Sequence, residues 1–110
     1  MNFNDYQQQA LTTLLSTGDE FKDIVHGVLG LSGEAGEVAD KFKKIVRDKQ
    51  GEISEQDRQE LSKEIGDVLW YIAVLAHLLG VPLEQLVEQN LEKLASRQQR
   101  GKLSGSGDNR

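Results

Sequence analysis

Two long stretches of this chain repeat apolar residues at alternating steps of three and four, and this pattern constrains the fold more than any other feature. A stripe of this kind, sustained over several turns, indicates an α-helix whose apolar side must be covered by another helix. We call the two series the apolar seams and expect them to pack against each other. The first seam is Ile24, Val28, Leu31, Ala35, Val38, Phe42 and Ile45, and the second is Leu61, Ile65, Val68, Ile72, Leu75 and Leu79.

Each seam carries an acidic pair with the same spacing. Glu34 and Glu37 lie in the first helical stretch, and Glu64 and Asp67 lie in the second. Residues three apart are neighbours on one helix face. All four precede a seam position by one residue, so antiparallel packing would bring four carboxylates to the edge of the core.

Four converging carboxylates repel one another, and a divalent cation would offset that cost. Oxygen-only ligands favour Mg²⁺, with Mn²⁺ as a substitute, and Mg²⁺ usually serves phosphate groups. The leading chemistry is therefore cleavage of a phosphate ester or phosphoanhydride. The alternative is a solvated acidic face, with Glu37 paired to Lys41 and Asp40 paired to Lys44.

Composition narrows the class of protein further. A chain of 110 residues fits one domain, and one Pro with few aromatics favours helix over sheet. A net charge of −5 argues against a nucleic-acid-coating surface, and the lack of Cys excludes disulfides and thiolate chemistry. No apolar run approaches the length of a membrane span. We expect a cytoplasmic protein that binds neither nucleic acid nor membrane.

Four helices are expected, at about residues 5–16, 20–47, 55–79 and 82–99. Asn4 or Asp5 would cap the first helix, and Ser54 with Asp57 would form a capping box for the third. Residues 1–100 would form the helical domain, and residues 101–110 would form a tail that is flexible or is ordered by substrate. Gly27, Gly30, Gly33 and Gly36 in the second helix indicate close approach by another helix or a ligand, or a kink near Gly33.

Two further segments concern assembly and binding. Residues 68–76 are apolar on all sides, which predicts a homo-oligomer, with Trp70 at a subunit contact or on a pocket wall. The fourth helix carries Asn90, Lys93 and Arg97 on one face. These residues would bind phosphate or form salt bridges with acidic residues such as Glu88 and Glu92.

The sequence lacks the residue spacings and motifs of several other kinds of active site. Neither His26 nor His77 follows a Glu by three residues, which excludes a di-iron bundle. No phosphate-binding Gly-rich loop and no serine nucleophile motif is present. Any nucleophile is therefore water, activated by a metal or a carboxylate.

The residues Glu34-x-x-Glu37 and Glu64-x-x-Asp67 resemble the signature of the MazG-like family of all-α nucleotide pyrophosphohydrolases. The stretches "LGLSGEAGEVAD", "EIGDVLWYIAVLAHLLG" and "NLEKLASRQQRG" share the resemblance, which covers roughly residues 20–110. The tail "GSGDNR" is similar to the small, single-domain members of phages and mobile cassettes.

The resemblance implies an oligomeric four-helix-type bundle, a dimer or a tetramer, that hydrolyses nucleoside triphosphates to monophosphate and pyrophosphate as a house-cleaning enzyme. It implies that all four acidic residues bind Mg²⁺ and that Glu34 or Glu37 orients or deprotonates the attacking water. The substrate-binding residues it implies are Lys44, Trp70, Tyr71, Asn90, Lys93 and Arg97.

This chain departs from the family pattern at one position. Many members have two adjacent glutamates where this chain has Gly33 followed by Glu34, which leaves open the number of metal ions and the identity of the base. Two rival hypotheses remain. One is a non-catalytic helical interaction module, and the other is a pyrophosphohydrolase of a non-nucleotide substrate.

Overall fold

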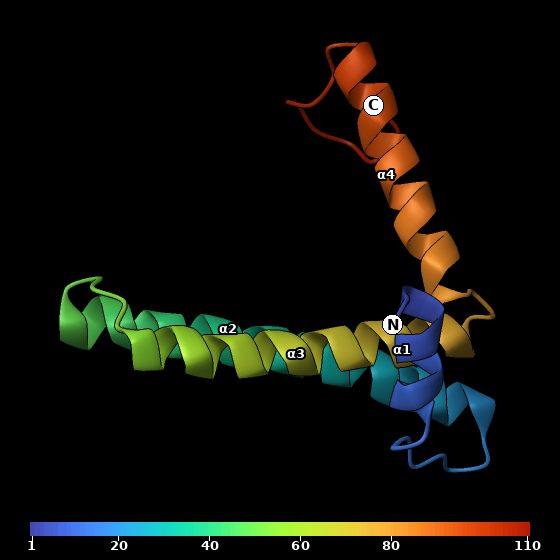
Figure 1. The fold of residues 1–110 in the computed structure, drawn as a ribbon, viewed down its shortest axis with the longest axis horizontal. Coiled ribbons are helices and arrows are strands. Elements are labelled where there is room, and N and C mark those ends of the chain that lie inside the picture. The colour runs from blue at the N-terminus through green and yellow to red at the C-terminus, as the bar shows by residue number, and fades with distance from the viewer.

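The two apolar seams form the two longest helices, which pack side by side and antiparallel (Figure 1). The computed structural model describes all 110 residues and contains four α-helices and no β-strand. The predicted all-α class is therefore confirmed. The helices are α1 (Phe3–Leu11), α2 (Glu20–Lys49), α3 (Glu55–Leu78) and α4 (Leu83–Gln99).

The first helix differs from its predicted bounds at both ends. Its N-cap is Asn2, whose side chain accepts from the Asp5 N–H while the Asp5 carboxylate accepts from the Asn2 N–H. The helix ends at Leu11 instead of residue 16, because the Thr12 and Thr13 hydroxyls donate to carbonyl oxygens of the last turn at 2.6 and 2.9 Å. The predicted caps Asn4 and Asp5 are therefore wrong, whereas the Ser54–Asp57 capping box of α3 is confirmed.

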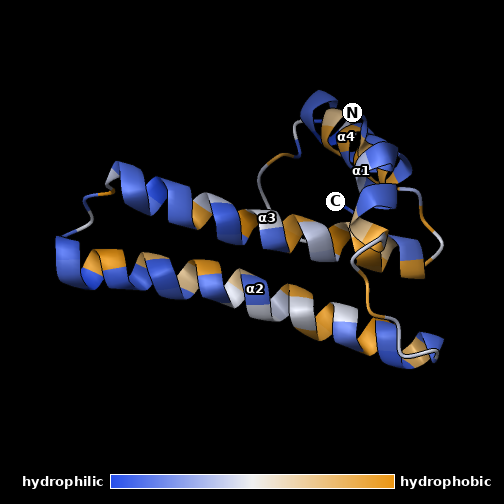
Figure 2. Cartoon of the chain, turned by 60° about the horizontal axis from the view of Figure 1, so that its bottom comes forward, coloured by the Kyte–Doolittle hydropathy of each residue, from blue (hydrophilic) through white to orange (hydrophobic).

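Only half of the first seam is covered within one chain. Ile24, Leu31, Val38 and Ile45, spaced by seven, are buried or half-buried, whereas Val28, Ala35 and Phe42, also spaced by seven, are exposed. On α3, Ile65 is likewise exposed. Figure 2 shows hydrophobic residues recurring along both helices. The α2–α3 contact therefore uses one edge of the seams and leaves the other edge open.

The glycines of α2 divide into two kinds. A Cβ at Gly27 would lie 3.2 Å from Leu75 Cδ1, and one at Gly30 would overlap the Tyr71 ring. The predicted close approach of another helix is thus confirmed at these two positions. No atom lies within 4 Å of a Cβ built at Gly33 or Gly36, and α2 continues unbroken through both.

The small core lies where α1, α3 and α4 meet. Ala10, Ala73, Val74 and Leu83 are its buried residues. Buried Gln7 joins the three helices there. Its amide nitrogen donates to the Ala73 and Val81 carbonyl oxygens at 3.0 and 3.1 Å, and its amide oxygen accepts from the Leu83 N–H at 3.0 Å.

The start of α4 is capped from α1. Pro82 offers no capping side chain, and the Asn4 amide oxygen accepts from the Glu84 N–H at 3.0 Å in its place. Gly80 has the left-handed φ of 76° that turns the chain out of α3. As a result α4 makes an angle of 102° with α3 and points away from α2 (Figure 1).

The single chain therefore consists of an antiparallel pair with α1 and α4 at one end, and it does not close a four-helix bundle by itself. Its radius of gyration is 16.9 Å, whereas a compact domain of this length has about 13 Å. No single helix is long and apolar enough to cross a membrane, and only the bent pair α3–α4, taken together, meets the criterion of length and composition.

Candidate metal and nucleotide site

Carboxylates from both long helices meet at the edge of the α2–α3 pair. Oxygen atoms of Glu34, Glu64 and Asp67 all lie within 4.8 Å of one another. Glu34 and Glu64 are half-buried and Asp67 is exposed. We call these three residues the carboxylate group. Antiparallel packing creates it, because the acidic residues sit at the same place relative to each seam.

Glu37 lies outside the carboxylate group and is exposed, so the expected convergence of four residues is one of three in this structure. Its predicted partner Lys41 also pairs elsewhere. The Lys41 Nζ lies 3.1 Å from Glu64 Oε1, since Lys41 follows Glu34 by two turns on the face that meets α3. The predicted Glu37–Lys41 pair is therefore wrong, and the salt bridge joins the two helices instead.

The carboxylate group is strongly negative. Burial raises the pKa of Glu34, and the nearby charges of Asp67 and Glu64 raise it further. The pKa of Lys41 is raised, chiefly by its hydrogen bond to Glu64. Asp67 also contributes to the raised pKa of Tyr6, after burial. Three oxygen ligands with mutual repulsion and one neighbouring lysine fit a hard divalent cation better than a soft one.

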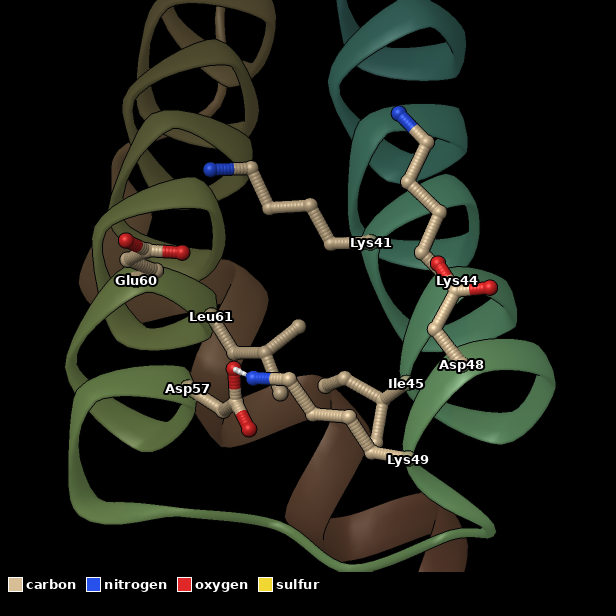
Figure 3. Close-up of a pocket in the computed structure, with 8 residues that line it drawn as sticks. All are labelled: Lys41, Lys44, Ile45, Asp48, Lys49, Asp57, Glu60 and Leu61. Atoms are coloured by element: carbon tan, nitrogen blue, oxygen red, sulfur yellow. Dashed lines mark hydrogen bonds and ion pairs between the residues drawn. The ribbon is translucent and has the colours of Figure 1, made fainter.

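Lys44 lies further along α2, on a cavity of about 150 Å³ between α2 and α3 (Figure 3). Figure 3 shows Lys41 extending across this cavity toward α3 and Lys49 meeting Asp57, at 2.7 Å. The predicted Asp40–Lys44 pair is confirmed at 2.9 Å, and Lys43 and Lys44 together lower the pKa of Asp40 to about 2. Lys44 is thus paired and is not part of the carboxylate group.

Trp70 and Tyr71 line a second cavity, of about 240 Å³, together with His26. The Trp70 indole N–H donates to Thr13 Oγ1 at 2.9 Å and to the Ala10 carbonyl oxygen at 3.2 Å. The Trp70 and Tyr71 rings meet edge to face with centroids 4.9 Å apart. Trp70 therefore lies on a pocket wall, which is one of its two predicted settings.

The wall of this cavity contains a residue that the sequence analysis missed. Asp23 accepts hydrogen bonds from the Ser16 and Thr17 hydroxyls at 2.6 and 2.7 Å and from the Thr17 N–H at 2.9 Å. These bonds lower its pKa and tie the α1–α2 connection to α2. The Ser-Thr-Gly-Asp run before α2 could have indicated these hydrogen bonds in the sequence, because such residues form local turns.

Asn90, Lys93 and Arg97 lie along α4, which points away from the α2–α3 pair (Figure 1). Their expected salt-bridge partners Glu88 and Glu92 are not used. Lys93 Nζ lies 3.2 Å from Asp108 Oδ1 of the C-terminal segment, and Arg97 also contacts Asp108. Asp108 was not predicted, since its Gly/Ser-rich surroundings suggested only a tail.

The helical pair and its carboxylate group define an all-α protein with an acidic site between two helices. Residues 26–101 match the MazG nucleotide pyrophosphohydrolase domain, and the chain belongs to this family. The family expected from the sequence is thus confirmed. The matched region contains all three members of the carboxylate group.

Two relatives are similar to this chain over most of its length or more than half of it. The chain is 46% identical over 114 residues to the Gene 37 protein of Mycobacterium phage L5, with both chains covered completely. It is 40% identical over 72 residues to the uncharacterized protein YvdC of Bacillus subtilis (strain 168), which covers 61% of this chain and 68% of YvdC. No solved structure gives a significant match.

Proposed function

We propose that this protein is a divalent-metal-dependent nucleotide pyrophosphohydrolase. It would convert a nucleoside or deoxynucleoside triphosphate to the monophosphate and pyrophosphate, as a house-cleaning activity on aberrant or surplus nucleotides. The observation that carries the proposal is the carboxylate group of Glu34, Glu64 and Asp67, within 4.8 Å, inside the region that matches the MazG domain.

The carboxylate group would hold Mg²⁺, or Mn²⁺ in its place, with Glu37 as the fourth acidic residue of the site. When bound, such a cation supplies positive charge for the phosphoryl oxygens. Lys41 restrains Glu64 through its 3.1 Å ion pair and so fixes one ligand across the two helices. Glu34 or Glu37 would orient the attacking water and accept its proton.

The remaining assignments concern the substrate. Trp70 and Tyr71 line a cavity large enough for part of a nucleotide, and an aromatic wall suits a base or a sugar. Lys44, Asn90, Lys93 and Arg97 are proposed to contact phosphate oxygens. Because α4 leaves the α2–α3 pair, its three residues would reach the carboxylate group of a second copy.

We propose a homo-oligomer, a dimer or a tetramer, and the exposed surface supports this proposal. One chain exposes 7897 Å², whereas a folded monomer of its mass exposes about 6,100 Å². The difference is about twice the area of roughly 800 Å² that one partner buries in a standard interface. The open edge of the seams, with Val28, Phe42 and Ile65, is the surface we assign to the second copy.

The test is release of pyrophosphate from a panel of standard and modified NTPs and dNTPs, with Mg²⁺ and with EDTA. We expect metal-dependent formation of monophosphate and pyrophosphate. Glu64→Gln should lower kcat by about 10²–10³ because a ligand is lost, whereas exposed Glu52→Gln, a change of the same charge in the α2–α3 connection, should not.

Two results would count against the proposal. Release of single phosphate would place the cleaved bond elsewhere in the triphosphate chain. No product from any nucleotide, with the folded oligomer confirmed, would favour first a non-nucleotide pyrophosphate substrate and then an interaction module.

A further inference from the structure

We propose that the C-terminal segment 101–110 is a positioning element that holds Lys93 and Arg97 in place for a phosphate-bearing ligand. We call this segment the tail clasp, and we assign to Arg110 the role of the positioning residue that keeps it closed. The inference rests on the proposed function only in assigning phosphate groups to Lys93 and Arg97.

Arg110 closes the tail clasp on itself. Its guanidinium donates to three carbonyl oxygens of the same segment, those of Gly107 at 2.8 Å and of Leu103 and Lys102 at 3.1 Å. Arg100 at the end of α4 donates to the Arg110 main-chain oxygen at 2.9 Å. These four hydrogen bonds hold the loop without involving Lys93 or Arg97.

The closed loop covers Arg97. This side chain is only 7% exposed although its neighbours on α4 are exposed. The Lys102 N–H donates to the Arg97 carbonyl oxygen at 2.7 Å, and an Arg97 Nη2 hydrogen is donated to the Asp108 carbonyl oxygen. A buried arginine of this kind has little rotamer freedom, so its guanidinium is held in one orientation.

Few of the hydrogen-bond donors of Arg97 bond to the tail clasp. Arg97 contacts Asp108 only through Nη2, and its buried Nε has no hydrogen-bond partner. A guanidinium has five N–H donors in a planar fork that matches phosphate, and a buried donor without a partner is costly. The tail clasp therefore leaves hydrogen-bond donors of the Arg97 guanidinium unused, and the proposed function assigns a phosphate group to that guanidinium.

Asp108 itself could instead be a stand-in for phosphate, with the tail clasp as a competitor. The contacts favour positioning. The Asp108 carboxylate pairs with Lys93 at 3.2 Å, but its 3.5 Å contact with Arg97 is long and its side chain is 85% exposed. The loop is also anchored by Arg110, so the contacts of Asp108 with the two cations are not the only bonds that close it.

The experiment compares three variants by calorimetric titration with inorganic pyrophosphate in the presence of EDTA. Arg110→Ala removes the three carbonyl bonds. Gly107→Ala leaves every charge in place but strains the loop, since Gly107 has φ 91°. Arg58→Ala is the matched control, because Arg58 is exposed and its side chain has no hydrogen bond or ion pair.

We expect Arg110→Ala and Gly107→Ala to bind pyrophosphate about 5- to 10-fold more weakly, because two side chains must then be ordered on binding. Arg58→Ala should bind as the unmodified chain does. In the nucleotide assay, both clasp variants should raise KM with little change in kcat, as expected for lost uniform binding. Circular dichroism will verify that the helix content of each variant is unchanged.

Unchanged or tighter binding in both clasp variants would overturn the inference, and tighter binding would identify the clasp as a competitor. Failure of the unmodified chain to bind pyrophosphate would overturn it as well. Loss of pyrophosphate binding in the clasp variants, in a protein that hydrolyses no nucleotide, would support the clasp and overturn the proposed function alone.

Discussion

Gln7 shows how one side chain sets the direction of a helix. Its amide meets the end of α3, the connection at Val81 and the first turn of α4. One side chain thus bonds three backbone groups from three parts of the chain at once. Because Asn4 completes the cap at Glu84, α1 determines where α4 begins and in which direction it leaves.

Replacement of this side chain tests that role. We expect Gln7→Leu to lower the free energy of unfolding by about 2–4 kcal/mol, since it keeps the volume but leaves buried polar groups unpaired. Chemical denaturation measures this difference. Gln8→Leu, at the exposed neighbouring position, should change the free energy by no more than about 0.5 kcal/mol. Equal effects of the two substitutions would contradict the role of Gln7.

Single residues also mark where prediction from the sequence ended. Spacing placed Glu34, Glu64 and Asp67 on faces that meet, because one face of a helix follows from residue number. The partner of Lys41 depends on which residue of α3 lies opposite it. This register between α2 and α3 is set when the two helices pack, so the sequence pattern does not predict it. Asp108 depends on a loop that folds back, which periodicity does not encode.

At the level of elements, the helices with strong terminal signals were predicted closely. Ser54 and Asp57 cap α3, and Gly80 ends it, as their side-chain and backbone chemistry dictates. The end of α1 was missed. Trp70 and two Thr hydroxyls bind the carbonyl oxygens of its last turn, and the indole comes from 57 or more residues away. Local Thr bonds and a tertiary contact with Trp70 therefore act together at that boundary.

The glycines of α2 provide a matched pair of substitutions. Gly30→Ala should lower the free energy of unfolding by about 1–3 kcal/mol, because the added methyl overlaps the Tyr71 ring. Gly36→Ala meets no atom within 4 Å and should raise it by about 0.5–1 kcal/mol through helix propensity. Thermal and chemical unfolding measure both. Destabilisation by Gly36→Ala would show that the open edge at Gly36 is covered in the assembled protein.

At the scale of the molecule, the structure is an incomplete helical bundle. The covered and the exposed seam residues of α2 each repeat every seven positions, so the helix presents two adjacent apolar edges. One edge contacts α3, and the other has no partner in the chain. The sequence predicted the seams, but it could not show which seam residues contact the other helix and which have no partner within the chain.

A charged substitution on the open edge of the seams tests whether a second copy covers that edge. We expect the unmodified protein to sediment at twice or four times its chain mass of 12.3 kDa, because an α2–α3 pair from a second copy would cover Val28, Phe42 and Ile65. Phe42→Glu should shift the mass toward a single chain, since it places a carboxylate in that interface at a cost of several kcal/mol. Leu15→Glu, at an exposed loop position, should leave the mass unchanged.

A monomeric unmodified protein at micromolar concentration would contradict the assignment of the open edge to a second copy. Lys93 and Arg97 of α4 could then not be supplied by a second copy. If Phe42→Glu loses both assembly and nucleotide hydrolysis while its helix content is unchanged, activity of the carboxylate group requires a second copy of the chain.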